Sequence, residues 1–167
     1  PIMDRVLGGN HQRALEMDDA VAETAKRLKV DGLLVVSPYY NRPSQDGLFA
    51  HFSKIADSTK LPIILYSIPG RCGIEIGVDT VATLAATKSN IVAIKEAGGS
   101  ADRVNQLRQV LPDSFTILSG DDGLTLPVMA VGGHGLVSVA AHVAGRDIKA
   151  VIENAGTALK AAQKANA

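Results

Sequence analysis

Cysteine and tryptophan are scarce in this sequence of 167 residues, which contains one cysteine, Cys72, and no tryptophan. A single cysteine excludes a disulfide within the chain and a zinc site built from several thiolates. We interpret Cys72 as a small buried residue, because no triad pattern surrounds it. Sparse cysteine usage favours a reducing compartment, so we expect a cytoplasmic protein.

Charge of one sign and long apolar runs are also absent. The 17 Lys and Arg residues balance the 17 Asp and Glu residues, so the formal net charge is zero. Nucleic acids and anionic membrane surfaces attract proteins through a basic field, and we therefore expect neither as a partner. No apolar run approaches the roughly 18 residues that a membrane span requires. Residues 1–5 do not have the pattern of a signal peptide.

Short apolar runs rich in β-branched residues recur along the chain and predict strands. They lie at 33–37, 63–67, 91–95, 115–119 and 135–139, with a weaker candidate at 6–7. Segments with helical spacing lie between them, at 14–28, 48–56, 81–85 and 104–111, and the Ala- and Lys-rich segment 146–167 predicts a final helix. Ser44, Asp79 and Ser100 are the expected helix caps. The strand runs are continuously apolar, which indicates a parallel sheet covered on both faces.

Two parallel architectures compete, a doubly wound open sheet and a (β/α)8 TIM barrel. A dinucleotide-binding doubly wound sheet would show Gly-x-Gly-x-x-Gly after its first strand, and Gly8-Gly9-Asn10 does not match. Polar residues follow every predicted strand, as in a barrel whose active site lies at the carboxyl ends of the strands. A closed barrel needs eight βα units and about 250 residues, whereas this chain has about six. We predict a partial TIM-barrel domain over 1–145 and the start of a C-terminal helical region over 146–167.

The sharpest chemical signal is Lys95, which ends an apolar strand. A lysine held in such a wall loses hydration, which favours the neutral amine that attacks carbonyl groups. Tyr66 ends another strand in the same way, and its phenol could move protons to and from an intermediate. The alternatives are that Lys95 begins a loop and pairs with Glu96, and that Tyr66 is an ordinary core tyrosine.

Arg71 lies between glycines in the segment 69–73, which would let the backbone turn and present the guanidinium to a carboxylate. An ordinary surface ion pair is the alternative. Tyr39 and Tyr40 follow the first clear strand, and adjacent side chains on an extended segment point in opposite directions, so one of them at most can face the site. The acidic segment 119–122 indicates structural capping rather than a metal site, and we expect no metal.

Taken together, five ordered motifs resemble the dihydrodipicolinate synthase family, within the pyruvate-dependent class I aldolases that form lysine Schiff bases. The motifs are PYYNRP at 38–43, LYSIPGR at 65–71, IKEA at 94–97, LSGDD at 118–122 and GGHGLVSV at 132–139. The similarity runs from about Gly8 to about Ala144. The resemblance implies a TIM barrel from which the first two βα units and most of the C-terminal helical extension are missing here.

The resemblance also implies the reaction. Lys95 would form a Schiff base with pyruvate, and Tyr66 would relay protons during its formation and during ring closure. Tyr40 would enter the site of a neighbouring subunit and complete the relay. Arg71 would hold the carboxylate of L-aspartate 4-semialdehyde. The product would be 4-hydroxy-tetrahydrodipicolinate, an intermediate of lysine and diaminopimelate biosynthesis, and the reaction would need no metal or organic cofactor.

Further roles follow from the same resemblance. Gly120 and Val137 would line the pyruvate pocket, and Asn10 and Tyr39 would belong to a site for lysine as a feedback effector. A homo-oligomer, either a dimer or a tetramer, is expected. Two other readings stay open: a catalytically inactive fragment of this family, and a sibling pyruvate aldolase with a different aldehyde substrate.

Overall fold

A parallel sheet forms the centre of the computed structural model, which describes residues 20, 23–25 and 27–156. The described part contains a sheet of five strands in consecutive order: β1 (Leu33–Val36), β2 (Ile63–Ser67), β3 (Ile91–Glu96), β4 (Thr116–Ser119) and β5 (Gly135–Leu136). Each strand pairs in parallel with the next along the chain. A doubly wound sheet reverses its strand order at a switch point, and these five strands contain no reversal. The order therefore agrees with the predicted barrel segment.

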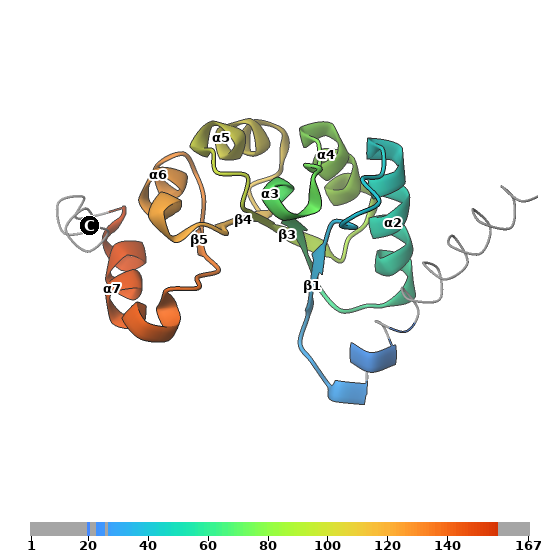
Figure 1. Cartoon of the computed structure of the whole chain (residues 1–167), viewed down its shortest axis with the longest axis horizontal. Coiled ribbons are helices and arrows are strands. Elements are labelled where there is room, and N and C mark those ends of the chain that lie inside the picture. The colour runs from blue at the N-terminus through green and yellow to red at the C-terminus, as the bar shows by residue number, and fades with distance from the viewer. Residues whose placement is uncertain (1–19, 21–22, 26, 157–167) are drawn as a thin grey trace, which may run out of the picture.

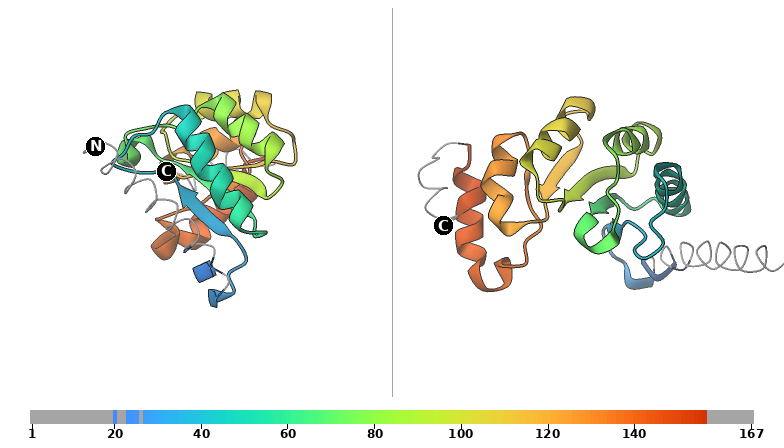
Figure 2. Two further views of the ribbon diagram at one scale, coloured as in Figure 1. Left: turned by 90° about the vertical axis from the view of Figure 1, so that its right-hand side faces the viewer. Right: turned by 45° about the horizontal axis from the view of Figure 1, so that its top comes forward.

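Helices cover one face of this sheet in chain order (Figure 1). They are α2 (Gln45–Ser58), α4 (Val78–Thr87), α5 (Ala101–Val110) and α6 (Thr125–Ala130), followed by α7 (Ala141–Asn154). Figure 2 shows α5, α6 and α7 side by side. Three short elements were not predicted from the sequence: the helix α3 (Pro69–Cys72), the 3-10 turn η1 (Asp122–Leu124) and the helix α6. No helix among the described residues is long and apolar enough to cross a membrane.

The hydrophobic core lies between the sheet and this layer of helices. Its fully buried members include Leu65 on β2, Ile94 on β3, and Leu84 and Leu107 on the helices. Burial alternates along β2, because successive side chains point to opposite faces of the sheet. Helices within the described part cover one face only, so the predicted cover on both faces is not found there.

Two of the three expected helix caps are confirmed. The hydroxyl of Ser44 accepts a hydrogen bond from the Gly47 N–H (3.2 Å), and that of Ser100 accepts one from the Arg103 N–H (3.3 Å). The expectation for Asp79 is wrong, because α4 begins earlier, at Val78, with Gly77 at the capping position. None of the described side chains caps the first turn of α4, but Gln45 Oε1 on α2 accepts from the Gly77 N–H at 2.7 Å and so ties the start of α4 to α2.

The predicted strand 135–139 is too long, because only Gly135 and Leu136 pair with β4 as a strand. The segment that follows turns away and hydrogen-bonds to a carboxylate on the β4–α6 loop. The final helix starts at Ala141 rather than Arg146, with a break in helical geometry at Ala144. The weak strand at 6–7 and most of the stripe 14–28 lie outside the described residues.

Truncation of the core should destabilise the fold strongly on α5. Leu107 is fully buried, and we expect Leu107→Ala to lower the free energy of unfolding by about 2–5 kcal/mol, through lost apolar contacts and the cavity left behind. Val110 lies on the same helix and is exposed, so Val110→Ala should change it by less than about 0.5 kcal/mol. Urea denaturation of both variants measures the difference, and equal losses would contradict the packing described here.

Candidate active site

The carboxyl ends of the strands gather the chemically active side chains. Tyr66 on β2 is the register partner of Lys95 on β3, and Lys95 is in turn the partner of Leu118 on β4. Parallel neighbours in register project to the same face, so Tyr66 and Lys95 share the face that the described helices leave free. The strand register thus brings together two residues that lie 29 positions apart in the sequence.

Lys95 is buried and in contact with Tyr66. The lysine is 8% exposed, and its Nζ lies 4.1 Å from the centroid of the Tyr66 ring. The negative face of an aromatic ring attracts an ammonium group, which favours this stacked arrangement. Lys95 does not begin a loop and does not pair with Glu96, because β3 continues through Glu96 and that carboxylate points to the opposite face, toward Arg103. The amine and the phenol therefore face the same space.

Gly120 supplies the room that the Lys95 side chain occupies. A Cβ at position 120 would lie 2.9 Å from Lys95 Cε and 2.7 Å from the Cβ of Ala97. Contacts under 3.0 Å force atoms to shift, so any larger residue here would displace the lysine. The Gly120 N–H also donates to the Glu96 carbonyl (2.7 Å), which fixes the start of the β4–α6 loop against β3.

Asp122 holds the segment after β5 in place. Its carboxylate accepts hydrogen bonds from the Ser138 hydroxyl and from the backbone N–H groups of Val139 (3.3 Å) and Ala140 (3.2 Å). The hydrogen bond from Ser138 is the largest of the effects that lower the pKa of Asp122, and burial opposes it. The two backbone N–H groups and the positive charge of Lys95 lower this pKa further. The lowered pKa favours the ionised carboxylate of Asp122. The sequence analysis predicted local capping for this segment and did not predict that Asp122 binds the segment after β5.

Val137 and Asp121 show what the neighbouring loop residues do. The Val137 N–H donates to the Ser119 carbonyl (2.9 Å), which extends the pairing of β4 and β5 to the predicted pocket residue. Asp121 caps η1 by accepting from the Gly123 N–H at 3.0 Å, as predicted for a structural carboxylate. Among the described residues, no group of three or more His, Cys, Asp and Glu side chains is arranged to hold a metal ion.

Arg71 and the two adjacent tyrosines line a separate open pocket of about 500 Å³. Its walls are Tyr39, Tyr40, Arg42, Arg71, Cys72 and Gly73. Tyr40 is 93% exposed and has a left-handed backbone with φ 72°. The structure therefore places Tyr40 and Arg71 at one pocket, and Lys95 with Tyr66 beside Gly120. Lys95 and Tyr66 are not among the residues that line that pocket.

Arg42 is a pocket residue that the sequence analysis missed. Its guanidinium packs over Gly73, where an added Cβ would lie 2.6 Å from the arginine Nε. Gly73 also has a φ of 70°, in the left-handed region that favours glycine. In the sequence, Arg42 could have been found from its position in the motif 38–43, two residues after Tyr40.

Cys72 fixes α3, and with it Arg71, to the end of β1. The buried thiol donates to the Ser37 carbonyl at 3.3 Å, and burial raises the pKa of Cys72. The prediction of a small buried residue is therefore confirmed. Of the two predicted effector residues, Tyr39 lines the pocket with Arg71, while Asn10 lies outside the described residues.

Comparison with known proteins identifies the family. A model of the dihydrodipicolinate synthetase family matches residues 6–167. The chain belongs to this family. The 4-hydroxy-tetrahydrodipicolinate synthase of Desulforudis audaxviator is 50% identical over 147 residues, which are 88% of this chain and 50% of the relative. The chain thus spans about half the length of the curated family members that it matches.

Solved structures of the family have the same fold. The synthase from the methanotroph Methylacidiphilum fumariolicum SolV matches with a TM-score of 0.85 and 53% identity, over 89% of this chain and 50% of that one. The chloride-inhibited synthase from Acinetobacter baumannii, solved in complex with pyruvate, matches with a TM-score of 0.83 and 37% identity, over 89% and 51%. The five-stranded sheet is therefore part of the family's TIM barrel, as predicted.

The buried carboxyl of Glu96 should make stability depend on pH. Burial raises the pKa of Glu96, although the charge of Arg103 and the Gly98 N–H oppose this. The folded state then binds a proton more tightly than the unfolded chain, whose glutamates titrate near about pH 4.3. The stabilising contribution is therefore complete below that pH and is lost as the pH rises above it.

We expect Glu96→Gln to remove this part of the pH dependence, because the amide does not titrate. Urea unfolding of wild type and variant between about pH 4 and about pH 7 measures the effect, and the wild type should lose more stability over this range. Glu153→Gln is the matched control, since Glu153 is exposed and pairs only with Lys149 on α7 in the described part. Parallel curves for wild type and Glu96→Gln would contradict the assignment.

Proposed function

We propose that this protein condenses pyruvate with L-aspartate 4-semialdehyde to give 4-hydroxy-tetrahydrodipicolinate, through a Schiff base on Lys95. The observation that carries the proposal is the position of the Lys95 amine, buried and 4.1 Å from the ring centroid of Tyr66. Membership of the family and similarity to a synthase solved with pyruvate support the choice of substrate. We also propose that the reaction belongs to lysine and diaminopimelate biosynthesis and that the protein works in the cytoplasm, as its single cysteine suggests.

The first half of the reaction takes place on pyruvate. The neutral amine of Lys95 attacks the keto carbon, and the carbinolamine loses water to give a protonated imine. This cation draws electrons from the adjacent methyl group, which releases a proton and leaves an enamine. Tyr66 lies where its hydroxyl could pass these protons. The chemistry needs only the covalent lysine adduct, so we propose that no metal or organic cofactor takes part.

The second half joins the two substrates. The enamine carbon attacks the aldehyde of the semialdehyde, which forms the new carbon–carbon bond and regenerates the imine. The amino group of the semialdehyde then attacks the imine carbon, displaces the Lys95 amine and closes the ring. Arg71 would bind the semialdehyde carboxylate as a charge-assisted pair, and Gly120 and Val137 would border the bound pyruvate.

Assembly into a homo-oligomer, a dimer or a tetramer, belongs to the same proposal. Tyr40 is 93% exposed and lines a pocket whose lining residues do not include Tyr66 or Lys95. An exposed tyrosine on a left-handed backbone is well placed to enter the site of a second copy and to continue its proton relay. Tyr39 and Asn10 stay the predicted residues for binding lysine as an effector.

Borohydride trapping tests the Schiff base directly. Incubation of the purified protein with pyruvate and borohydride should leave a pyruvate-sized adduct on Lys95, which peptide mass spectrometry locates. Lys95→Arg should give none, because a guanidinium cannot form the imine. Lys88→Arg should keep the adduct, since Lys88 is paired with Asp57, outside the candidate site. A folded wild type without an adduct at saturating pyruvate would favour the inactive fragment over the enzyme.

Arg71→Ala tests the choice of aldehyde. Loss of a charged hydrogen-bonding partner costs about 1.5–3 kcal/mol, so kcat/KM for the semialdehyde should fall by roughly 10- to 150-fold, while pyruvate trapping on Lys95 stays unchanged. Arg146→Ala, exposed on α7, is the control and should leave turnover as it is. Unchanged turnover in Arg71→Ala would favour a sibling aldolase with another aldehyde substrate.

A further inference from the structure

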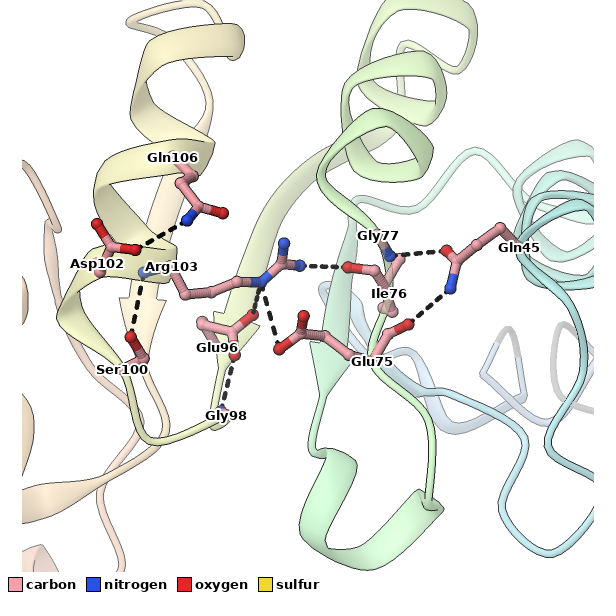
Figure 3. Close-up of polar contacts among 10 residues, drawn as sticks. All are labelled: Gln45, Glu75, Ile76, Gly77, Glu96, Gly98, Ser100, Asp102, Arg103 and Gln106. Carbon is pink, nitrogen blue, oxygen red and sulfur yellow. Dashed lines mark hydrogen bonds and ion pairs between the residues drawn. The ribbon is translucent and has the colours of Figure 1, made fainter.

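A network of polar contacts lies on the face of the sheet that the helices cover, opposite to the face of Lys95 and Tyr66 (Figure 3). Its centre is Glu96, the residue after Lys95. The Glu96 side chain is 2% exposed, its Oε1 accepts from the Gly98 N–H at 2.7 Å, and its Oε2 lies 3.5 Å from Arg103 Nε. The carboxyl group therefore ties the end of β3 to its own loop and to α5.

Arg103 carries the contact across to the preceding βα loop. It lies in the first turn of α5, and its side chain is 7% exposed. Its Nη2 donates to the Ile76 carbonyl, and its Nε lies 3.6 Å from Glu75 Oε1. Figure 3 shows the guanidinium spanning the space between α5 and the segment before α4. One side chain thus joins the β3–α5 loop to the β2–α4 loop.

Gln45 extends the network to a third loop. Its Nε2 donates to the Glu75 carbonyl (2.9 Å), and its Oε1 accepts from the Gly77 N–H (2.7 Å) and the Thr80 hydroxyl (2.8 Å). Gln45 begins α2, directly after the loop that carries Tyr40 and Arg42. The contacts therefore connect the loops that follow β1, β2 and β3. Tyr40 and Arg71 lie in the first two of these segments, and Tyr66 and Lys95 lie on the strands that lead into the second and third.

A buried ion pair of this kind contributes more to geometry than to net stability. Removing two charges from water costs several kcal/mol per ion, and apolar replacements of similar volume are often as stable. Lys95 and Glu96 are adjacent on one strand and point to opposite faces. Fixing the Glu96 side chain from behind therefore fixes the backbone from which the Lys95 amine projects toward Tyr66.

From these contacts we propose that Arg103 is a positioning residue for Lys95, acting through Glu96 and the Ile76 carbonyl. The proposal rests on the proposed function, because it assigns Arg103 an effect on Schiff-base formation. Arg103 does not touch the reacting atoms. Arg103 fixes the position of the Lys95 amine. Loss of Arg103 should therefore slow the formation of the Schiff base rather than weaken the binding of pyruvate.

Arg103→Lys tests the proposal, with Arg108→Lys as the matched control. Both arginines lie on α5 and donate to backbone carbonyls, but Arg108 binds those of Leu111, Pro112 and Phe115, at the far end of the helix. Lysine keeps the charge and loses the planar fork of donors. The measurement is the rate of borohydride-trappable adduct on Lys95 against pyruvate concentration.

We expect Arg103→Lys to lower the maximal trapping rate by about tenfold or more, because displacement of a reacting group by about 1 Å can cost 10²-fold. The pyruvate concentration at half-maximal rate should stay near the wild-type value, and Arg108→Lys should trap at the wild-type rate. Equal rates for the two variants, or a change confined to half-saturation, would overturn the proposal. Absence of any adduct on the wild type would instead overturn the proposed function.

A second pair of variants decides the question if Arg103→Lys does not fold. Glu96→Gln keeps an oxygen that can accept from the Gly98 N–H, whereas Glu96→Ala keeps no contact with either Gly98 or Arg103. A positioning role predicts faster trapping by Glu96→Gln than by Glu96→Ala, with similar half-saturation by pyruvate in both. Equal maximal rates would count against the role of this network in placing Lys95.

Discussion

The arrangement of the site depends on one constraint, the opposite orientation of two adjacent residues at the end of β3. Lys95 projects to the side where Tyr66 lies, and Glu96 projects into the helix layer. The Lys95 side chain needs open space beside Tyr66, and the Glu96 side chain needs a partner that holds it in the helix layer. Gly120 provides the space by lacking a Cβ, and Arg103 provides the anchor. A substitution that displaces the side chain on one face of β3 should also shift the side chain on the other face, because Lys95 and Glu96 share the same backbone.

The two faces of the sheet at the end of β3 therefore have different roles, one with the candidate catalytic groups and one with the contacts that hold the strand in place. The face with Lys95 and Tyr66 holds an amine and a phenol, which are groups that can exchange protons. On the opposite face, Glu96 and Arg103 pair with each other and hydrogen-bond to backbone groups of the neighbouring loops. Asp122 performs a similar supporting role at the other end of the site, because its carboxylate collects three donors from the segment after β5. The Lys95 amine therefore projects from a strand end whose following loop is tied to its neighbours.

Much of this could be predicted from the sequence. The apolar runs located all five strands, because buried parallel strands have a composition unlike that of their flanks. Lys95 and Tyr66 stood out as polar residues at the ends of such runs. The contact of Arg103 with Glu96 and Ile76 could not be predicted, since it joins loops through the packing of α4 against α5. The role of Asp122 was missed for a similar reason: its partners lie 16 to 18 residues away, beyond the reach of a local capping pattern.

The consecutive order of the strands has a consequence for how the chain reaches this structure. Leu33 pairs with Ile63, and Ile63 with Ile91, so each new strand closes a loop of similar and modest length. The entropic cost of loop closure rises only slowly with length, and among the described strands every pairing joins neighbours in the sequence. The sheet can therefore grow by accretion, one βα unit docking on the last, with each docked unit serving as the template for its successor.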